Sequence, residues 1–295
     1  MDNIFLQLII NGIEIGSIYA LIASGFSIVF NIQKFINIAH GGIYILSAFL
    51  AYYFIKILGT SYIIGILSSI ICCNIIGYLI DTFVYEKLKN TSQRSLSLLI
   101  LSFSIFIFIQ SIILLSFGGN VYSYGIIAEI GYNFYGAYIT KIQLFILFIT
   151  LIVFLDLFFL LKKTWLGRSM KAIADDEIVA STIGINVTLV NEVTFLIGTT
   201  LSAIAGILIS FEQNIEFNMG LMAVLKGITA SIIGGMGSVL GVFLSGLILG
   251  TIESIGAFYL SSTWKDAISF GILILFLLFR PNGLFGFKSR KEIGG

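Results

Sequence analysis

Charged side chains are scarce in this chain of 295 residues. Asp, Glu, Lys and Arg make up only 11% of it, whereas 58% of the residues are hydrophobic, and the mean hydropathy is +1.07. Soluble globular domains carry about a quarter charged residues, so a water-soluble fold of this composition could not cover its own surface. The net charge is +1 and no basic stripe occurs, so nothing points to a nucleic-acid partner. The composition predicts an all-α polytopic membrane protein in contact with lipid.

Residues with reactive chemistry are also few. His40 is the only histidine, and Cys72 and Cys73 are adjacent within an apolar run, without the spacing of zinc ligands. We interpret the two cysteines as small buried residues and expect no metal site. P-loop, GxSxG and HExxH motifs are absent. These absences argue against an enzyme, and they require another subunit to supply ATP hydrolysis if the chain pumps a solute.

The apolar residues gather in runs long enough for membrane-crossing helices, which need about 20 residues. The first run is expected to stay in the protein, because the N-terminus lacks the basic region of a cleaved signal. The runs at 222–236 and 266–280 are short for a full crossing. We predict nine transmembrane or partly re-entrant helices: 4–30, 41–58, 61–83, 95–117, 142–161, 191–211, 222–236, 238–260 and 266–280.

Lys and Arg concentrate in some connecting segments and are sparse in others. Three segments carry most of them, namely 85–94, 162–171 and the C-terminal tail, whereas 118–141, 212–221 and 261–265 have one at most. Short cytoplasmic loops are enriched in Lys and Arg. We therefore expect an N-terminus outside and a cytoplasmic C-terminus.

Small residues recur every four positions in three of the runs. In lipid, such strips allow close helix packing. The runs 4–30, 191–211 and 238–260 are therefore expected inside the bundle, and 142–161, which lacks Gly, Ala and Ser, at its periphery. The predicted packing residues are Gly12, Gly16, Ala20, Gly198, Gly206, Gly237, Gly241, Gly246 and Gly250.

Polar residues inside the runs are costly in lipid and usually face protein or water. Glu253 lies deep in 238–260, and either function or structural hydrogen bonding by a protonated carboxyl, as for Glu14, would explain it. The break "NIQKFINIAHGG" places Asn37 and His40 just before a helix that we expect to begin at Gly41. A polar break is tolerated where it is buried or lines a cavity, although a lone histidine is more often a local hydrogen-bond partner.

The segment 162–190 is the longest polar stretch expected in the cytoplasm. We predict one amphipathic helix over about 170–183, with Met170, Ile173, Ala174 and Ile178 on one face. Gly184 would end this helix, and Asn186 would cap the next. The acidic run at 175–177 favours a groove on a partner protein over a membrane surface.

Several blocks together resemble one family. They are "NGIEIGSIYALIASGFSIVFNI", "INIAHGG", "GRSMKAIADDEIVASTIGIN", "IIGGMGSVLGVFLSGLILGTIES" and "KDAISFGILILFLLFRPNGLFG". Over nearly the whole chain, this set is similar to the permease subunits of branched-chain amino acid ABC importers of the LivH type. Gly42 stands where the family often has an acidic residue after His-Gly, so no role of that acid carries over.

The resemblance implies a single permease domain over 1–295 in the cell (inner or cytoplasmic) membrane. Its implied partners are a second, homologous or identical permease, two cytoplasmic ATPases and an external substrate-binding protein. ATP would be used by the ATPases, with no cofactor on this chain. The segment 162–190 would be the cytoplasmic coupling loop that contacts the ATPase, through Gly167, Arg168, Lys171, Ala174, Asp175, Asp176, Glu177, Ile178 and Gly184.

The implied activity is import of branched-chain or related hydrophobic amino acids by alternating access. As a hypothesis, the substrate path is lined or bordered by Asn11, Ser17, Tyr19, Asn37, His40 and Glu253. Other cargoes, such as urea, short amides or a sugar, fit the same scaffold. A stand-alone secondary transporter is a further alternative, disfavoured because no chain of buried charges is evident. A single His without a partnered nucleophile makes an intramembrane enzyme a poor fit.

Overall fold

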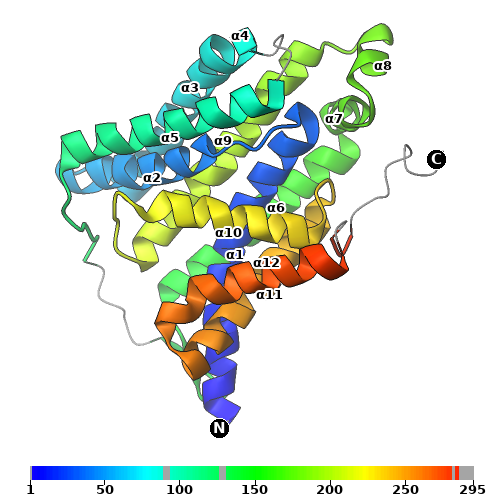
Figure 1. Cartoon of the computed structure of the whole chain (residues 1–295). Coiled ribbons are helices and arrows are strands. Elements are labelled where there is room, and N and C mark those ends of the chain that lie inside the picture. The colour runs from blue at the N-terminus through cyan, green and yellow to red at the C-terminus, as the bar shows by residue number, and fades with distance from the viewer. Residues whose placement is uncertain (1, 89–93, 126–130, 281–282, 286–295) are drawn as a thin grey trace. The chain divides into compact units, whose positions relative to one another are not determined.

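The computed structural model describes residues 2–88, 94–125, 131–280 and 283–285, and helices dominate it (Figure 1). One small antiparallel hairpin pairs Asn133 with Tyr138. The elements are α1 (Asp2–Gln33), α2 (Ala39–Tyr52), the π-helix η1 (Tyr53–Ile57), α3 (Tyr62–Ile80), the π-helix η2 (Asp81–Tyr85), α4 (Glu86–Leu88), α5 (Arg94–Phe117), β1 (Tyr132–Phe134), β2 (Ala137–Ile139), α6 (Lys141–Lys163), α7 (Trp165–Asp175), α8 (Glu177–Thr182), α9 (Val187–Glu212), α10 (Met219–Gly234), α11 (Val239–Leu260), the 3-10 helix η3 (Ser262–Trp264) and α12 (Lys265–Phe279).

Eight helical stretches of the described chain are long and apolar enough to cross a membrane. They coincide within a few residues with eight of the nine predicted segments, and the ninth, expected at 222–236, is the shorter apolar helix α10. The prediction of an all-α polytopic membrane protein is therefore confirmed. The direction in which the chain crosses the membrane stays a prediction.

The chain divides into two compact units, each assembled from separated stretches. The first takes the described residues within 1–27, 128–154 and 225–295, and the second those within 28–127 and 155–224. Three helices, α1, α6 and α10, contribute residues to both units. The single permease domain expected over 1–295 stays a prediction.

The second unit is built around α2 and α9. Helix α2 packs against α3, α5 and α9, and α3 also packs against α9 (Figure 1). The backbones of α2 and α9 approach closely at Gly206, where any side chain would collide with the Tyr44 carbonyl and Ser47. The contact is further tied by the Ser202 hydroxyl, which donates to the His40 carbonyl at 2.7 Å.

In the first unit, the small residues of α1 face those of α11. A Cβ added to Gly16 would lie 2.8 Å from Leu247 Cα, and one added to Gly246 would lie 2.6 Å from Ala20 Cα. Gly12 meets Thr251 and Gly250 in the same way. These residue types permit a backbone approach that larger side chains would prevent.

Gly237 is a correction to the predicted packing strip. It lies in the turn before α11, with φ of +106°, where its amide donates to the Ser27 hydroxyl. This backbone conformation favours glycine for its lack of a Cβ. Gly241 does lie on α11, against Gly234 and Phe285, and Gly198 lies buried in α9.

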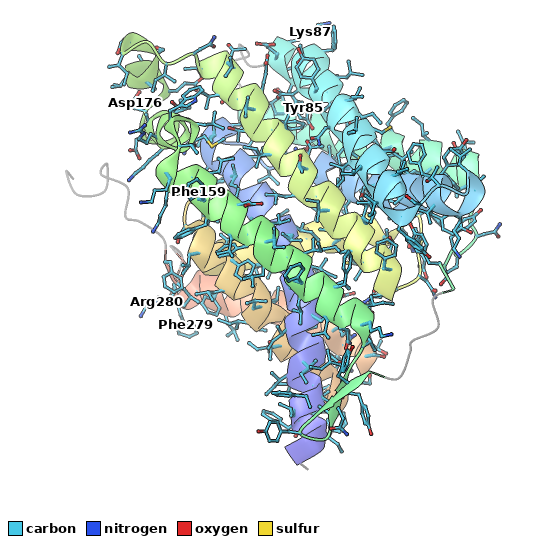
Figure 2. The ribbon with its side chains drawn as sticks, turned by 180° about the vertical axis from the view of Figure 1, so that it is seen from behind. Tyr85, Lys87, Phe159, Asp176, Phe279 and Arg280 are labelled. Carbon is cyan, nitrogen blue, oxygen red and sulfur yellow. The ribbon has the colours of Figure 1, made fainter. Side chains whose placement is uncertain are left out.

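The burial of the helices agrees with the prediction of which lie inside the bundle and which at its periphery, except at α11. In the most apolar stretch of α1 and of α9, 78% and 72% of the residues are buried, against 17% for α6. Phe159 of α6 is 63% exposed (Figure 2). Only 39% of the corresponding stretch of α11 is buried, because Leu240, Leu244, Ile248 and Ile252 form an exposed strip at four-residue spacing. Helix α2, with 61%, is the more interior element.

Candidate functional site

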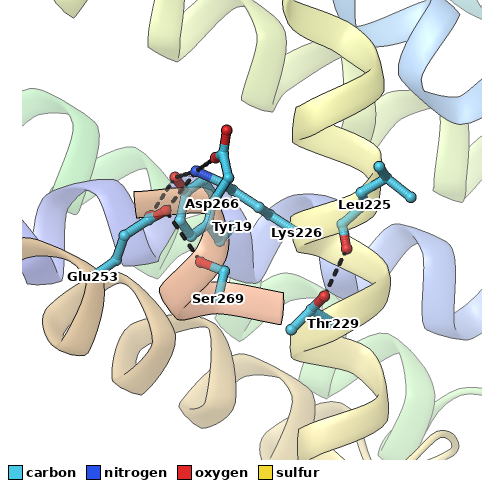
Figure 3. Close-up of polar contacts among 7 residues, drawn as sticks. All are labelled: Tyr19, Leu225, Lys226, Thr229, Glu253, Asp266 and Ser269. Atoms are coloured by element: carbon cyan, nitrogen blue, oxygen red, sulfur yellow. Dashed lines mark hydrogen bonds and ion pairs between the residues drawn. The ribbon is translucent and has the colours of Figure 1, made fainter. Parts of the chain in front are cut away.

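Lys226 of α10 is buried among charged and hydroxyl groups of three other helices (Figure 3). Its Nζ lies 2.5 Å from Glu253 Oε1 on α11 and 2.9 Å from Asp266 Oδ1 on α12. It also donates to the hydroxyl of Tyr19 on α1 at 3.2 Å and lies 5.4 Å from the centre of that ring. All four helices contribute these residues to the first unit.

Glu253 is the most enclosed charged residue of the group, with only 2% of it exposed. One oxygen accepts from Lys226 and from Ser269 at 3.1 Å, and the other accepts from the Tyr19 hydroxyl at 2.7 Å. A buried charge is tolerated when it is paired and its remaining lone pairs are hydrogen-bonded.

We name Tyr19, Lys226, Glu253, Asp266 and Ser269 the Lys226 cluster. Each charged residue at the centre of a membrane helix costs about 2.5–3.5 kcal/mol on insertion scales, so such residues are functional candidates. Tyr19 also packs against an apolar group formed by Ala23, Ala230, Ile233, Val242 and Leu249. The arrangement thus presents an ammonium, carboxylates and hydroxyls beside aliphatic side chains, which are groups that could bind the charged ends and the apolar part of an amino acid.

Asn11 and Ser17, also expected on the substrate path, have other polar partners in the same unit. Asn11 Oδ1 accepts from Gln7 at 3.0 Å and from Gln143 at 3.4 Å, and Gln143 also donates to Glu14 at 2.9 Å. The Ser17 hydroxyl donates to the carbonyl of Glu14, one turn back in α1. None of the hydrogen bonds described for Asn11 and Ser17 links them to the Lys226 cluster.

Asn37 and His40 belong to the second unit. Helix α1 ends at Gln33, because the next residue, Lys34, has a φ of +58°, and α2 begins at Ala39, two residues before the expected Gly41. His40 therefore lies inside the first turn of α2 and is buried. Asn37 Oδ1 accepts from the hydroxyl of the fully buried Tyr85 at 3.0 Å.

The predicted coupling loop contains two short helices, not one. Asp176 lies between them, exposed, with extended backbone (φ −158°), and its carboxylate accepts from the amides of Ile178 and Val179 as the N-cap of α8 (Figure 2). Met170 and Ile173 of α7 are buried, but Ile178 is 75% exposed on α8, so the expected common face is wrong. The end at Gly184 and the cap at Asn186 are confirmed.

The remaining loop residues divide between support and surface. Gly167 is buried against the Leu161 carbonyl, and its amide donates to Thr164. Asp175 lies near Lys34, where desolvation lowers the pKa of the lysine and the Asp175 carboxylate acts to raise it. The exposed members are Arg168, Lys171, Asp175, Asp176, Glu177, Ile178 and Gly184, and Ala174 is half-buried.

Lys226, Asp266 and Ser269 were not identified from the sequence. The available signal was the lone charge of Lys226 inside the apolar run 222–236. The sequence argument against a secondary transporter did not identify a buried ion pair of the first unit, Lys226 with Glu253, beside the half-exposed Asp266.

A family model described as "Branched-chain amino acid transport system / permease component" matches residues 8–277. The high-affinity branched-chain amino acid transport system permease protein LivH of Salmonella typhimurium is 35% identical over 96% of both chains. BraD of Pseudomonas aeruginosa, described in the same terms, is 33% identical over 96% of both. The xylose transport system permease protein XylH of Haemophilus influenzae is 32% identical over 40% of this chain and 33% of its own length.

Among solved structures, PsaBC from Streptococcus pneumoniae in complex with Fab matches 94% of this chain and 92% of its own, with a TM-score of 0.55 and 13% identity. This likeness concerns the fold alone. The family match and the near full-length relatives agree with the eight apolar helices and with the resemblance seen in the sequence. The chain therefore belongs to the branched-chain amino acid transport system permease family, as a multi-pass membrane permease component.

Proposed function

We propose that this chain is the membrane subunit of an ATP-driven importer of branched-chain or related hydrophobic amino acids. The observation that carries the proposal is the 35% identity over 96% of both chains with a permease of a branched-chain amino acid transport system. The chain has no P-loop, so ATP is hydrolysed by separate ATPase subunits. This chain itself is non-catalytic and holds no cofactor.

The proposed assembly contains a second permease, identical or homologous, two cytoplasmic ATPases and an external binding protein. The exposed face of α8 and the end of α7 contact an ATPase, because this loop is polar and lies between two membrane helices. Closure of the ATPases moves the loop, and the substrate path changes the side on which it is open. Coupling requires that binding-protein release and ATPase closure favour the same conformation.

The substrate path, in this proposal, is bordered by the Lys226 cluster through Tyr19 and Glu253, and by Asn11, Ser17, Asn37 and His40. An amino acid carries one carboxylate and one ammonium group. Lys226 and Glu253 carry the complementary pair of charges at 2.5 Å from each other. If the substrate carboxylate pairs with Lys226 and its ammonium group pairs with Glu253, every charge keeps a partner. This pairing limits the desolvation cost of binding.

Reconstitution with the cognate ATPases and binding protein tests the function. In proteoliposomes, we expect ATP-dependent uptake of L-leucine, L-isoleucine or L-valine, and no accumulation without the ATPases. Uptake of xylose in place of these amino acids would support the second candidate cargo, which the partial similarity to a xylose permease favours. Urea and short amides serve as further competitors. Accumulation of an amino acid by this chain alone would refute the ATP-driven mechanism.

A further inference from the structure

An open cavity of about 480 Å³ lies in the second unit, beside the coupling loop. Its walls come from α4, the first residue of α5, α8 and the first turns of α9. Small-molecule sites in proteins commonly have volumes of about 300–1,000 Å³. The cavity shares no residue with the Lys226 cluster, and its α8 wall belongs to the coupling loop that moves in the proposed mechanism.

One part of the cavity wall favours a negative group. Arg94 lines it as the first residue of α5, and Val187 and Thr188 line it as the first two residues of α9. The first amides of a helix have no acceptor within the helix and lie at the positive end of its dipole. Arg94 Nε is a buried donor without a hydrogen-bond partner in the described structure. These groups suit a carboxylate.

Another part of the wall favours a positive group. Glu86 and Glu177 contribute carboxylates, and Glu177 meets Arg94 only at 3.4 Å. Asn191 also lines the cavity, is 3% exposed, and has an Oδ1 atom that accepts no hydrogen bond from the described residues. A buried acceptor left without a donor costs about 1–3 kcal/mol, and an ammonium group would supply that donor.

We propose that the cavity binds an α-amino acid as a zwitterion, with an aliphatic side chain against Ile178 and Val187. Ile178 lines the cavity although it is 75% exposed, so it is available to cover such a side chain. An inorganic anion would face the repulsion of Glu86 and Glu177, and a simple amine that of Arg94. Only a ligand with both charges is matched at every part of the wall.

The occupant regulates transport, and this step rests on the proposed function. A bound amino acid contacts α8 together with α5 and α9, and so holds the coupling loop against the rest of the second unit. Because the loop must move with the ATPases, such a ligand opposes the movement. The site therefore acts as a feedback site, at which imported amino acid that accumulates on the cytoplasmic side slows further import.

Binding to the purified permease tests the site without any transport step. L-leucine is compared with isovalerate, which lacks the ammonium group, and isoamylamine, which lacks the carboxylate. We expect L-leucine to bind at least about tenfold more tightly than either, and Arg94→Gln to weaken it by about tenfold. Lys87→Gln, which changes an exposed charge beside Glu86 that does not line the cavity, serves as the control. Equal affinity in Arg94→Gln and wild type, or equal binding of leucine and isovalerate, would overturn the proposal.

Regulation is then measured in the complete transporter. L-leucine placed on the ATPase side of proteoliposomes should lower the initial uptake rate of the wild type. Glu86→Gln should leave the rate without that leucine unchanged and abolish the inhibition, and Asn191→Leu provides a second, nearly isosteric variant. Uptake that is insensitive to leucine on the ATPase side would refute the feedback role. A complex that transports no amino acid would instead contradict the proposed function, and the binding comparison would still decide the site.

Discussion

At Lys226 a single ammonium group of the first unit meets the buried Glu253 carboxylate, the half-exposed Asp266 carboxylate and a phenol. The loss of one member of such a group is worse than the loss of the whole pair, because it leaves an uncompensated buried charge. The cluster is therefore best tested by single and paired substitutions, which separate its contribution to folding from its contribution to transport.

Lys226→Met is expected to destabilise the protein by about 3–5 kcal/mol, because it removes the ammonium partner of the buried Glu253. The pair Lys226→Met with Glu253→Gln should recover most of this loss. Thermal unfolding in detergent measures both. If the stable pair still takes up amino acid at the wild-type rate, the cluster does not border the substrate path.

A similar comparison of single and paired substitutions tests the polar segment that contains Asn37 and His40. Asn37→Ala removes the acceptor of the buried Tyr85 hydroxyl, which should cost about 1–3 kcal/mol. Tyr85→Phe in the same chain removes the stranded hydroxyl and should restore stability, since the ring keeps its contacts with Phe35 and Phe195. Unfolding temperatures of the two single variants and the double variant give the coupling. We expect amino-acid uptake to be lower than in the wild type both in the double variant and in His40→Ala. Uptake at the wild-type rate in both variants would show that Asn37 and His40 do not border the substrate path.

At the scale of helices, the sequence predicted most of the fold because apolar run length alone locates membrane helices. The strips of small residues also marked positions of α1 and α11 that pack closely, although the sequence did not pair these two helices. Sequence reasoning missed the break at Asp176, because the exchange of one helix for two depends on a single side chain that caps α8. It missed the Lys226 cluster because its charged members lie on three helices, at positions that follow no periodicity.

The close approach of α1 and α11 gives a prediction at this scale. Gly16→Ala should destabilise the protein by about 1–3 kcal/mol, since the new methyl group would lie 2.8 Å from the backbone of Leu247. Gly271→Ala in α12 is the matched control, because its Cβ meets no atom within 4 Å. The control should be neutral or slightly stabilising, by about 0.5–1 kcal/mol. Equal unfolding temperatures for the two variants would contradict the packing argument.

The N-cap of α8 gives a second prediction at the scale of helices. Asp176→Ala removes the acceptor for two amides and should cost α8 about 0.5–2 kcal/mol, whereas Asp176→Asn keeps a capping side chain. We expect the Ala variant to be cut faster by protease within 177–182 and to co-purify less ATPase. The Asn variant should behave as the wild type. Undiminished ATPase binding by the Ala variant would show that α8 does not need its cap to dock.

For the whole molecule, the distribution of Lys and Arg predicts which loops are cytoplasmic. Ser123→Cys should react with a membrane-impermeant maleimide added outside intact cells, and Thr182→Cys should react only after the membrane is opened. Both residues are exposed in the structure, whereas of the natural cysteines, both predicted to be buried, Cys73 is buried and Cys72 is only partly buried. The reverse labelling pattern would invert the topology, and it would place the coupling loop on the side away from the ATPases.

The partners of Lys226 also have a consequence for how the chain is made. Glu253 follows Lys226 by 27 residues and Asp266 comes later still, so the ribosome completes α10 before either carboxylate exists. At about 5–20 residues per second, this interval lasts about 1–5 s. During it, the lysine has no counter-charge with which to enter lipid. We therefore expect α10 to enter the bilayer together with the hairpin that follows it, and a chain truncated before Glu253 to keep α10 at the translocon.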